Sequence, residues 1–68
     1  MIPKVTTVGL GYIGLPTSAL IASNGIEVFG VDINPEVVET INQGKIHIIE
    51  PDLEDAVAQA VEKGYLKA

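Results

Sequence analysis

A glycine-rich hexapeptide, GLGYIG at residues 9–14, constrains the fold more than any other feature of the sequence. It follows an apolar, β-branched run over residues 4–8 and precedes an apolar run with helical spacing. Glycines in this pattern between a strand and a helix are typical of dinucleotide-binding βαβ units. The pattern also calls for an acidic residue about 20 positions further on, and Asp32 ends the next strand-like run.

Each glycine of the hexapeptide has its own predicted role. Gly9 permits a tight turn out of the strand, Gly11 lets a pyrophosphate approach the backbone because it has no Cβ, and Gly14 lets the helix lie close to the strand. The N–H groups at the helix start favour phosphates, and Asp32 is predicted to accept hydrogen bonds from the adenine ribose. The alternative is a structural turn without a ligand, in which Asp32 is a turn or cap residue.

The composition predicts a folded chain that is smaller than an ordinary domain. The 68 residues are 47% hydrophobic, rich in aliphatic side chains and poor in aromatic ones, which is typical of parallel strands buried on both faces. A net charge of −5 without any arginine argues against a nucleic-acid partner. The absence of cysteine excludes disulfides and thiolate metal sites within these residues.

No targeting or membrane segment is expected. The start, Met1–Lys4, lacks the pattern of a signal peptide, and no stretch approaches the roughly 20 apolar residues of a membrane span. The default expectation is a soluble, cytoplasmic protein that binds no membrane.

Five elements are expected, in the order β-α-β-α-α. They are a strand over residues 4–8, a helix over 12–23, a strand over 26–31, a helix from Pro35 to Gly44 capped by Asn34, and a helix over 51–63. The last four residues are too short to assign. This order is a partial Rossmann-type (doubly wound) α/β sheet without its third strand. Residues 1–68 are therefore interpreted as the N-terminal portion of a larger dinucleotide-binding domain, or as a piece completed by another chain.

The spacing of apolar residues predicts which helix faces are buried. The expected core residues are Leu15, Ala19 and Ala22, then Val37, Val38 and Ile41, then Leu53, Val57, Ala60 and Val61. The lone histidine, His47, is expected to be structural or solvated. The acidic residues from Glu50 to Asp55 are expected to favour the start of the last helix and to bind no metal.

Four motifs in the same order resemble the UDP-glucose/GDP-mannose dehydrogenases. They are VGLGYIGLP at 8–16, VDIN at 31–34, INQG at 41–44 and EPDL at 50–53, so the resemblance covers nearly the whole chain. It implies NAD as the cofactor, with the three glycines at the pyrophosphate and Asp32 at the ribose. It also implies that Tyr12 and Ile13 donate backbone N–H groups beside the pyrophosphate. The charge of Asp32 would repel a 2′-phosphate, which favours NAD over NADP.

The resemblance implies a two-step oxidation of the C6 alcohol of a UDP-sugar to a carboxylate, with two NAD. The family uses a cysteine nucleophile and a lysine, so the catalytic residues and the sugar pocket are expected beyond Ala68. Residues 46–53 are most similar to members that oxidise UDP-N-acetylmannosamine. The parent protein is expected to be a homo-oligomer. The alternative function is a non-catalytic dinucleotide-binding or NAD-sensing module. A catalytic cysteine and lysine in a second domain downstream would establish the enzyme instead.

Two positions depart from the family pattern. Asp52 stands where many relatives have glycine, and Val37 stands where many carry a lysine or arginine near the adenine ribose. The second departure predicts that no basic side chain contacts the ribose, and it leaves the role of Asp32 unchanged.

Overall fold

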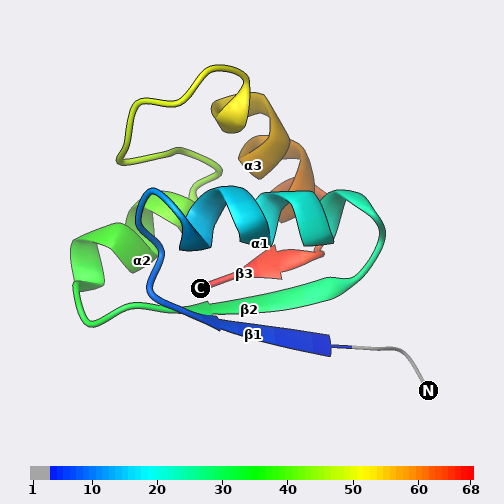
Figure 1. Cartoon of the computed structure of the whole chain (residues 1–68), viewed down its shortest axis with the longest axis horizontal. Helices are drawn as coiled ribbons and strands as arrows, with labels where there is room; N and C mark the ends of the chain where they lie inside the picture. Colours follow the sequence, from blue (N-terminus) through cyan, green and yellow to red (C-terminus); the bar gives the residue numbers. More distant parts are fainter. Residues whose placement is uncertain (1–3) are drawn as a thin grey trace.

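A parallel three-stranded sheet is the base of the fold, which the computed structural model describes over residues 4–68. The strands are β1 (Lys4–Val8), β2 (Glu27–Val31) and β3 (Leu66–Lys67), in the order β1-β2-β3. Val28, near the start of β2, pairs with Val5 on one side and with Leu66 on the other. Because β1 and β2 run in the same direction, their carboxyl ends meet at one edge of the molecule (Figure 1).

Three helices connect the strands. They are α1 (Gly14–Ser23), α2 (Pro35–Asn42) and α3 (Leu53–Glu62). α1 joins β1 to β2, whereas α2 and α3 both lie between β2 and β3 in the chain. α1 packs against β2 and against α3, and both helices lie on one side of the sheet (Figure 1).

Local sequence signals place the ends of the helices. The side chain of Asn34 accepts a hydrogen bond from the N–H of Glu36 at 3.0 Å, and Pro35 is the first helical residue, which confirms the predicted start of α2. Gly25 follows α1 with a φ of +80°, as its predicted role as a stop requires. α1 and α3 each begin two residues later than predicted, because residues 11–13 form the glycine turn and Asp52 takes a left-handed conformation.

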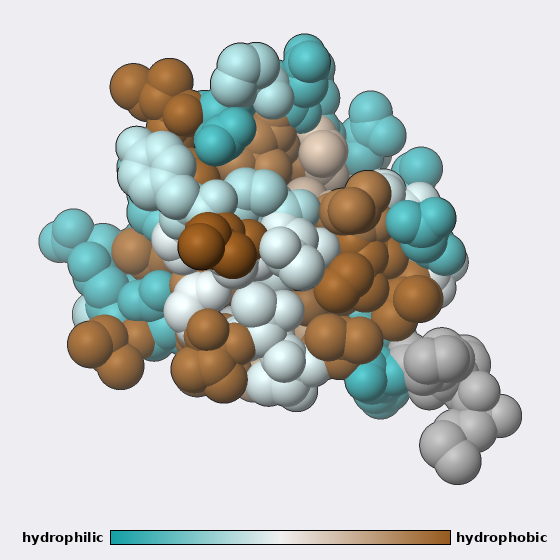
Figure 2. Space-filling view, in the orientation of Figure 1, coloured by the Kyte–Doolittle hydropathy of each residue, from teal (hydrophilic) through white to brown (hydrophobic). Residues whose placement is uncertain are grey.

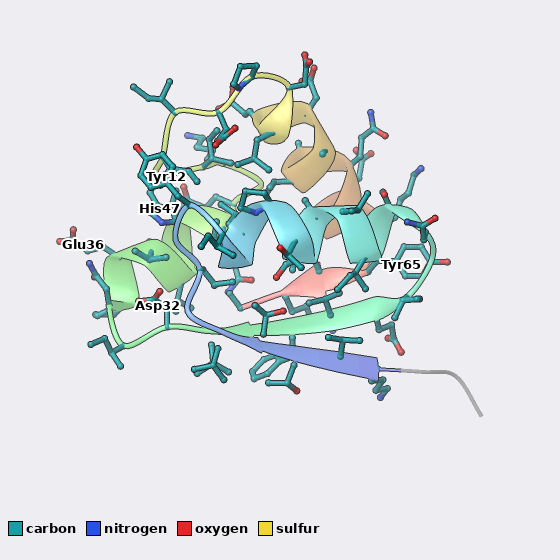
Figure 3. All side chains as sticks on the ribbon, viewed as in Figure 1. Tyr12, Asp32, Glu36, His47 and Tyr65 are labelled. Carbon is teal, nitrogen blue, oxygen red and sulfur yellow. The ribbon has the colours of Figure 1, made fainter. Side chains whose placement is uncertain are left out.

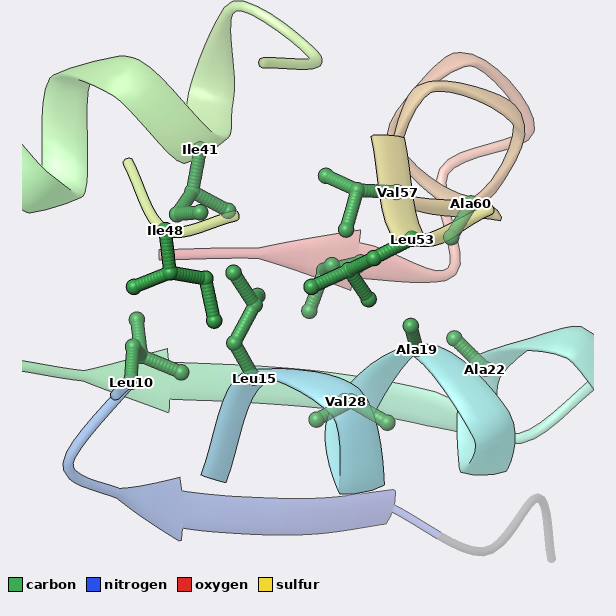
Figure 4. Close-up of a cluster of buried hydrophobic side chains, with 11 residues drawn as sticks. Leu10, Leu15, Ala19, Ala22, Val28, Ile41, Ile48, Leu53, Val57 and Ala60 are labelled. Carbon is green, nitrogen blue, oxygen red and sulfur yellow. The ribbon is translucent and has the colours of Figure 1, made fainter. Parts of the chain in front are cut away.

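The core forms between the helices and the covered face of the sheet (Figure 4). Its buried hydrophobic residues are Leu10, Leu15, Ala19, Ala22, Val28, Ile41, Ile48, Leu53, Val57, Ala60 and Leu66. The predicted face of α1 is confirmed, and so is that of α3 except that Val61 is only partly buried. α2 buries Ile41 fully and Val37 and Val38 only partly. Leu10 and Ile48 enter the core from loops, where helical spacing gives no signal.

The prediction that the third strand is missing is wrong. Residues 65–68, too short to assign from the sequence, contain β3. Leu66 is buried, and the N–H of Val28 donates to the carbonyl oxygen of Tyr65 at 2.7 Å. The side chain of Asn42 donates to the carbonyl oxygen of Ala68 and accepts from its N–H, both at 2.9 Å. These contacts join residues far apart in the sequence, so local patterns could not predict them.

Residues 4–68 cover only one face of the sheet, so the prediction of strands buried on both faces is not met there. On the open face Val8 and Phe29 are 82% and 53% exposed, and they alternate with the inward-facing residues of β1 and β2. Apolar side chains appear at the surface near these strands (Figure 2).

No helix within residues 4–68 is long and apolar enough to cross a membrane. Met1–Pro3, for which no signal peptide is expected, lie outside the described residues.

Candidate functional site

The three glycines of the hexapeptide occupy three different environments. Gly9 has a φ of +88°, in the left-handed region that favours glycine. A Cβ on Gly14 would collide with the carbonyl oxygen of Gly9, so the start of α1 reaches the end of β1 only because Gly14 has no side chain. A Cβ on Gly11 would meet no atom within 4 Å, so Gly11 faces open space.

The start of α1 presents backbone N–H groups. The N–H groups of Leu15 and Thr17 donate to the carbonyl oxygens of Gly11 and Ile13, which closes the first turn. The N–H groups of Gly11, Tyr12 and Ile13 donate to no acceptor within residues 4–68. The first turn has neither an acidic residue nor a capping side chain. This end of the helix is therefore free to bind an anion.

Asp32 links the glycine turn to the end of β2. Its Oδ2 accepts from the N–H of Leu10 at 3.0 Å, and its Oδ1 accepts from the N–H of Asn34 at 2.9 Å. These two hydrogen bonds hold the pKa of the Asp32 carboxyl below its ordinary value because they stabilise the charged form. The bond from Asn34 has the larger effect and the bond from Leu10 the smaller one. Each oxygen has two lone pairs, so the carboxylate can still accept further hydrogen bonds.

Hollows flank Asp32 at the carboxyl ends of β1 and β2. One, of about 140 Å³, is lined by Val8, Gly9, Val31, Asp32 and Ile33. A wider one, on the side of α2, also includes Asp32 and Ile33 in its lining. Ile33 is fully exposed, which gives this region an apolar side chain beside a carboxylate. Such a pair of surfaces suits a nucleoside, whose base is flat and apolar and whose ribose carries hydroxyl groups.

The structure brings all six predicted site residues to one end of the molecule. Tyr12 lies on the turn ahead of α1, and Asp32 lies at the end of β2 (Figure 3). Tyr12 and Ile13 are both exposed residues of this turn. The glycines and Asp32 are joined through Leu10, whose N–H bonds the carboxylate.

The remaining polar candidates form no metal centre in the described part of the chain. His47 is exposed in the loop between α2 and α3, and its charge contributes a smaller lowering of the pKa of Asp32. The acidic residues from Glu50 to Asp55 surround the start of α3, and between Lys4 and Ala68 no three His, Cys, Asp or Glu side chains are placed to hold a metal ion.

The sequence interpretation missed two residues, Leu10 in the turn and Gly30 in β2. Leu10 is completely buried, and its side chain lies directly over Gly30 of β2. The apolar residue inside the glycine motif and the glycine inside a strand were the available signals. Within the family motif INQG, Ile41 is in the core and Asn42 bonds the backbone of Ala68, so these two residues make structural contacts.

Comparison with known proteins gives consistent matches over almost the whole chain. Residues 3–68 match the UDP-glucose/GDP-mannose dehydrogenase family, NAD binding domain. The chain is 61% identical over 64 residues to the NDP-N-acetyl-D-galactosaminuronic acid dehydrogenase of Ralstonia nicotianae. It is 60% identical over 65 residues to the UDP-N-acetyl-D-mannosamine dehydrogenase of Campylobacter jejuni. The two alignments cover 94% and 96% of this chain, but only 15% and 16% of the relatives.

A solved structure has the same fold. The UDP-glucose dehydrogenase from the hyperthermophilic archaeon Pyrobaculum islandicum matches with a TM-score of 0.92 and 37% sequence identity. The match covers 98% of this chain and 16% of that chain. The Rossmann-type arrangement expected from the sequence is thereby confirmed for these residues.

Proposed function

Because the chain belongs to the UDP-glucose/GDP-mannose dehydrogenase family and matches its NAD-binding domain, we propose that its glycine turn and Asp32 hold the adenosine and pyrophosphate of NAD. The chain spans less than a fifth of its relatives, so the activity of the whole protein is part of this proposal. That activity is the oxidation of the C6 alcohol of a nucleotide sugar to the carboxylate, in two NAD-dependent steps. NAD supplies a hydride acceptor when it is bound, and the residues described here only bind and orient it.

One observation carries the assignment of the site. The free N–H groups of residues 11–13 and the carboxylate of Asp32 lie at the same edge of the sheet, joined through the N–H of Leu10. The first group suits a pyrophosphate, because N–H groups at a helix start bind anions. The second suits the ribose hydroxyls, which donate hydrogen bonds to a carboxylate. The open space at Gly11 supports the approach of the phosphates to the backbone.

The charge of Asp32 supports NAD over NADP. Backbone hydrogen bonds keep the carboxyl ionised by lowering its pKa, and a 2′-phosphate would meet this charge at short range. The side chain of Val37 is apolar and packs against the core, so it supplies no positive charge for such a phosphate. Both features favour the unphosphorylated cofactor.

We infer an N-acetylated amino sugar linked to UDP as the substrate, with UDP-N-acetylmannosamine as the first choice. The support is the similarity of residues 46–53 and the name of the relative from Campylobacter jejuni. The relative from Ralstonia nicotianae is named for an N-acetylgalactosaminuronic acid, so the sugar stereochemistry must be tested. Cytoplasmic location and homo-oligomeric assembly belong to the same proposal.

The decisive experiment measures NADH formation by the full-length protein that carries this sequence. UDP-N-acetylmannosamine, UDP-N-acetylgalactosamine, UDP-glucose and GDP-mannose are offered separately with NAD. We expect two NADH per molecule of UDP-N-acetylmannosamine and little with the non-acetylated sugars. Oxidation of UDP-glucose alone would overturn the substrate, whereas NAD binding without NADH formation from any sugar would indicate a non-catalytic module.

The residue assignment is tested with Asp32→Ala. We expect its Kd for NAD, measured by calorimetry, to rise by about tenfold, because the ribose loses a charged acceptor. The preference for NAD over NADP should narrow at the same time. Equal affinity of the variant and the wild-type protein for NAD would show that Asp32 does not bind the ribose.

A further inference from the structure

Leu10, the residue between the first two glycines, is fixed to β2 from two sides. Its backbone N–H donates to Asp32 at 3.0 Å, and its side chain, 0% exposed, lies against Gly30. The preceding N–H, that of Gly9, donates to the carbonyl oxygen of Val31 at 2.7 Å. Three successive residues, the last two of β2 and Asp32 directly after it, therefore hold two successive residues of the turn.

The space between Leu10 and Gly30 is filled. A Cβ on Gly30 would lie 2.7 Å and 2.8 Å from the two Cδ atoms of Leu10, whereas ordinary van der Waals contact begins at 3.4 Å. The Leu10 side chain cannot simply swing away, because it is enclosed by the core that includes Leu15 and Ile48 (Figure 4). A Cβ on Gly30 would therefore press on the end of the Leu10 side chain, which has no free space in the core to move into.

We propose that Leu10 and Gly30 are positioning residues for the cofactor, which set the place of the Gly11 backbone against the pyrophosphate. This inference rests on the proposed NAD site. Gly11 follows Leu10 directly, so a shift of Leu10 moves the free N–H groups of residues 11–13. Binding groups must be held within about 0.5 Å of their productive geometry. The shift that would take the nearer Cδ atom of Leu10 from 2.7 Å to 3.4 Å from a Cβ on Gly30 is larger than this tolerance.

The alternative is that Leu10 contributes only to the stability of the core. A core residue remote from the turn separates the two roles. Val57 is 0% exposed and belongs to the same hydrophobic cluster, but it lies on α3, and the atoms nearest to a Cβ on Gly30 all come from Leu10. Val57→Ala is therefore the matched control for a loss of core packing.

The experiment is a double-mutant cycle on NAD binding by the full-length protein. Kd values are measured by calorimetry for the wild-type protein, Gly30→Ala, Leu10→Ala and the double variant, with folding checked by circular dichroism. We expect Gly30→Ala to raise the Kd about tenfold, and Val57→Ala to leave it unchanged. The double variant should bind NAD more tightly than the product of the two single effects predicts, because Leu10→Ala removes the atoms that the new Cβ would strike.

The outcomes distinguish this inference from the proposed function. If the wild-type protein binds no NAD, the proposed function fails and the inference fails with it. If the wild-type protein binds NAD and Gly30→Ala binds it equally well, only the inference is overturned. An equal loss of NAD affinity in Val57→Ala would also overturn the inference. Should Gly30→Ala not fold, Leu10→Val provides a second test, because its shorter side chain lacks the Cδ atoms that lie against Gly30. An unchanged Kd in that variant contradicts the positioning role.

Discussion

At the scale of a single residue, the ionised carboxyl of Asp32 stabilises the folded protein by an amount that depends on pH. Hydrogen bonds from the N–H groups of Asn34 and Leu10 lower its pKa in the folded protein below the ordinary value of 3.8. The stabilisation is therefore fully present above the unfolded pKa, and it is lost as the pH falls through the folded pKa. We expect Asp32→Asn to be less stable than the wild-type protein near neutral pH and to approach it in strong acid. Urea midpoints measured over this range check the prediction, and a difference independent of pH would contradict it.

Asp52 is a second single residue with a testable energetic effect, because its backbone is strained. It is the only non-glycine residue with a positive φ between Lys4 and Ala68, at +63°, and its side chain makes no capping hydrogen bond. We expect Asp52→Gly to be about 1 kcal/mol more stable than Asp52→Ala, because alanine keeps the left-handed penalty that glycine avoids. Thermal unfolding of the two variants provides the measurement, and equal stability would show that no strain is stored at Asp52.

Individual residues differ in how well the sequence predicts them. The glycines and Asp32 were predicted because their roles depend on a fixed spacing along the chain. Leu10 and Gly30 were not, because their contact depends on the distance between a turn and a neighbouring strand. The binding roles of all six predicted site residues remain predictions until NAD binding is measured.

At the scale of elements, the last residue of α2 holds the strand that the sequence did not reveal. Asn42 makes two hydrogen bonds to the backbone of Ala68, which follows β3. We expect Asn42→Ala to reduce the free energy of unfolding by about 1 kcal/mol, since each exposed hydrogen bond contributes modestly. The amides of β3 should also lose protection against hydrogen exchange.

The neighbouring Gln43 provides the control for this prediction. Its side chain makes only a 3.4 Å hydrogen bond to Glu39, within the same helical turn. Gln43→Ala should leave the hydrogen exchange of β3 unchanged. A similar loss of protection in both variants would mean that the end of α2 as a whole supports β3, and not the two hydrogen bonds of Asn42.

The sequence predicted an element accurately where its local signal was strong. α2 was placed well because Asn34 and Pro35 form a strong start signal. β3 was missed because two residues carry no periodicity, and its stability comes from Val28 and Asn42, which lie far away in the chain. Short strands that depend on distant partners lie outside what local patterns can predict.

At the scale of the whole molecule, the composition predicted more burial than residues 4–68 achieve. Aliphatic strands with few aromatics indicated a sheet covered on both faces, but α1 and α3 cover one face only. The open face carries Val8, Phe29 and Val31, all exposed, and they lie close together because Val8 pairs with Val31. An exposed apolar surface of this kind promotes association with other apolar surfaces.

We therefore expect the isolated 68-residue polypeptide to self-associate through this face. Sedimentation velocity over a range of concentrations measures the association. Phe29→Thr removes an exposed aromatic ring from the open face while keeping a residue that favours strands, so it should weaken the association several-fold, by about 1 kcal/mol. Leu20→Thr is the matched control, because Leu20 is 66% exposed but lies on α1. Equal weakening by both variants would mean that the polypeptide associates through general hydrophobicity and not through the open face of the sheet.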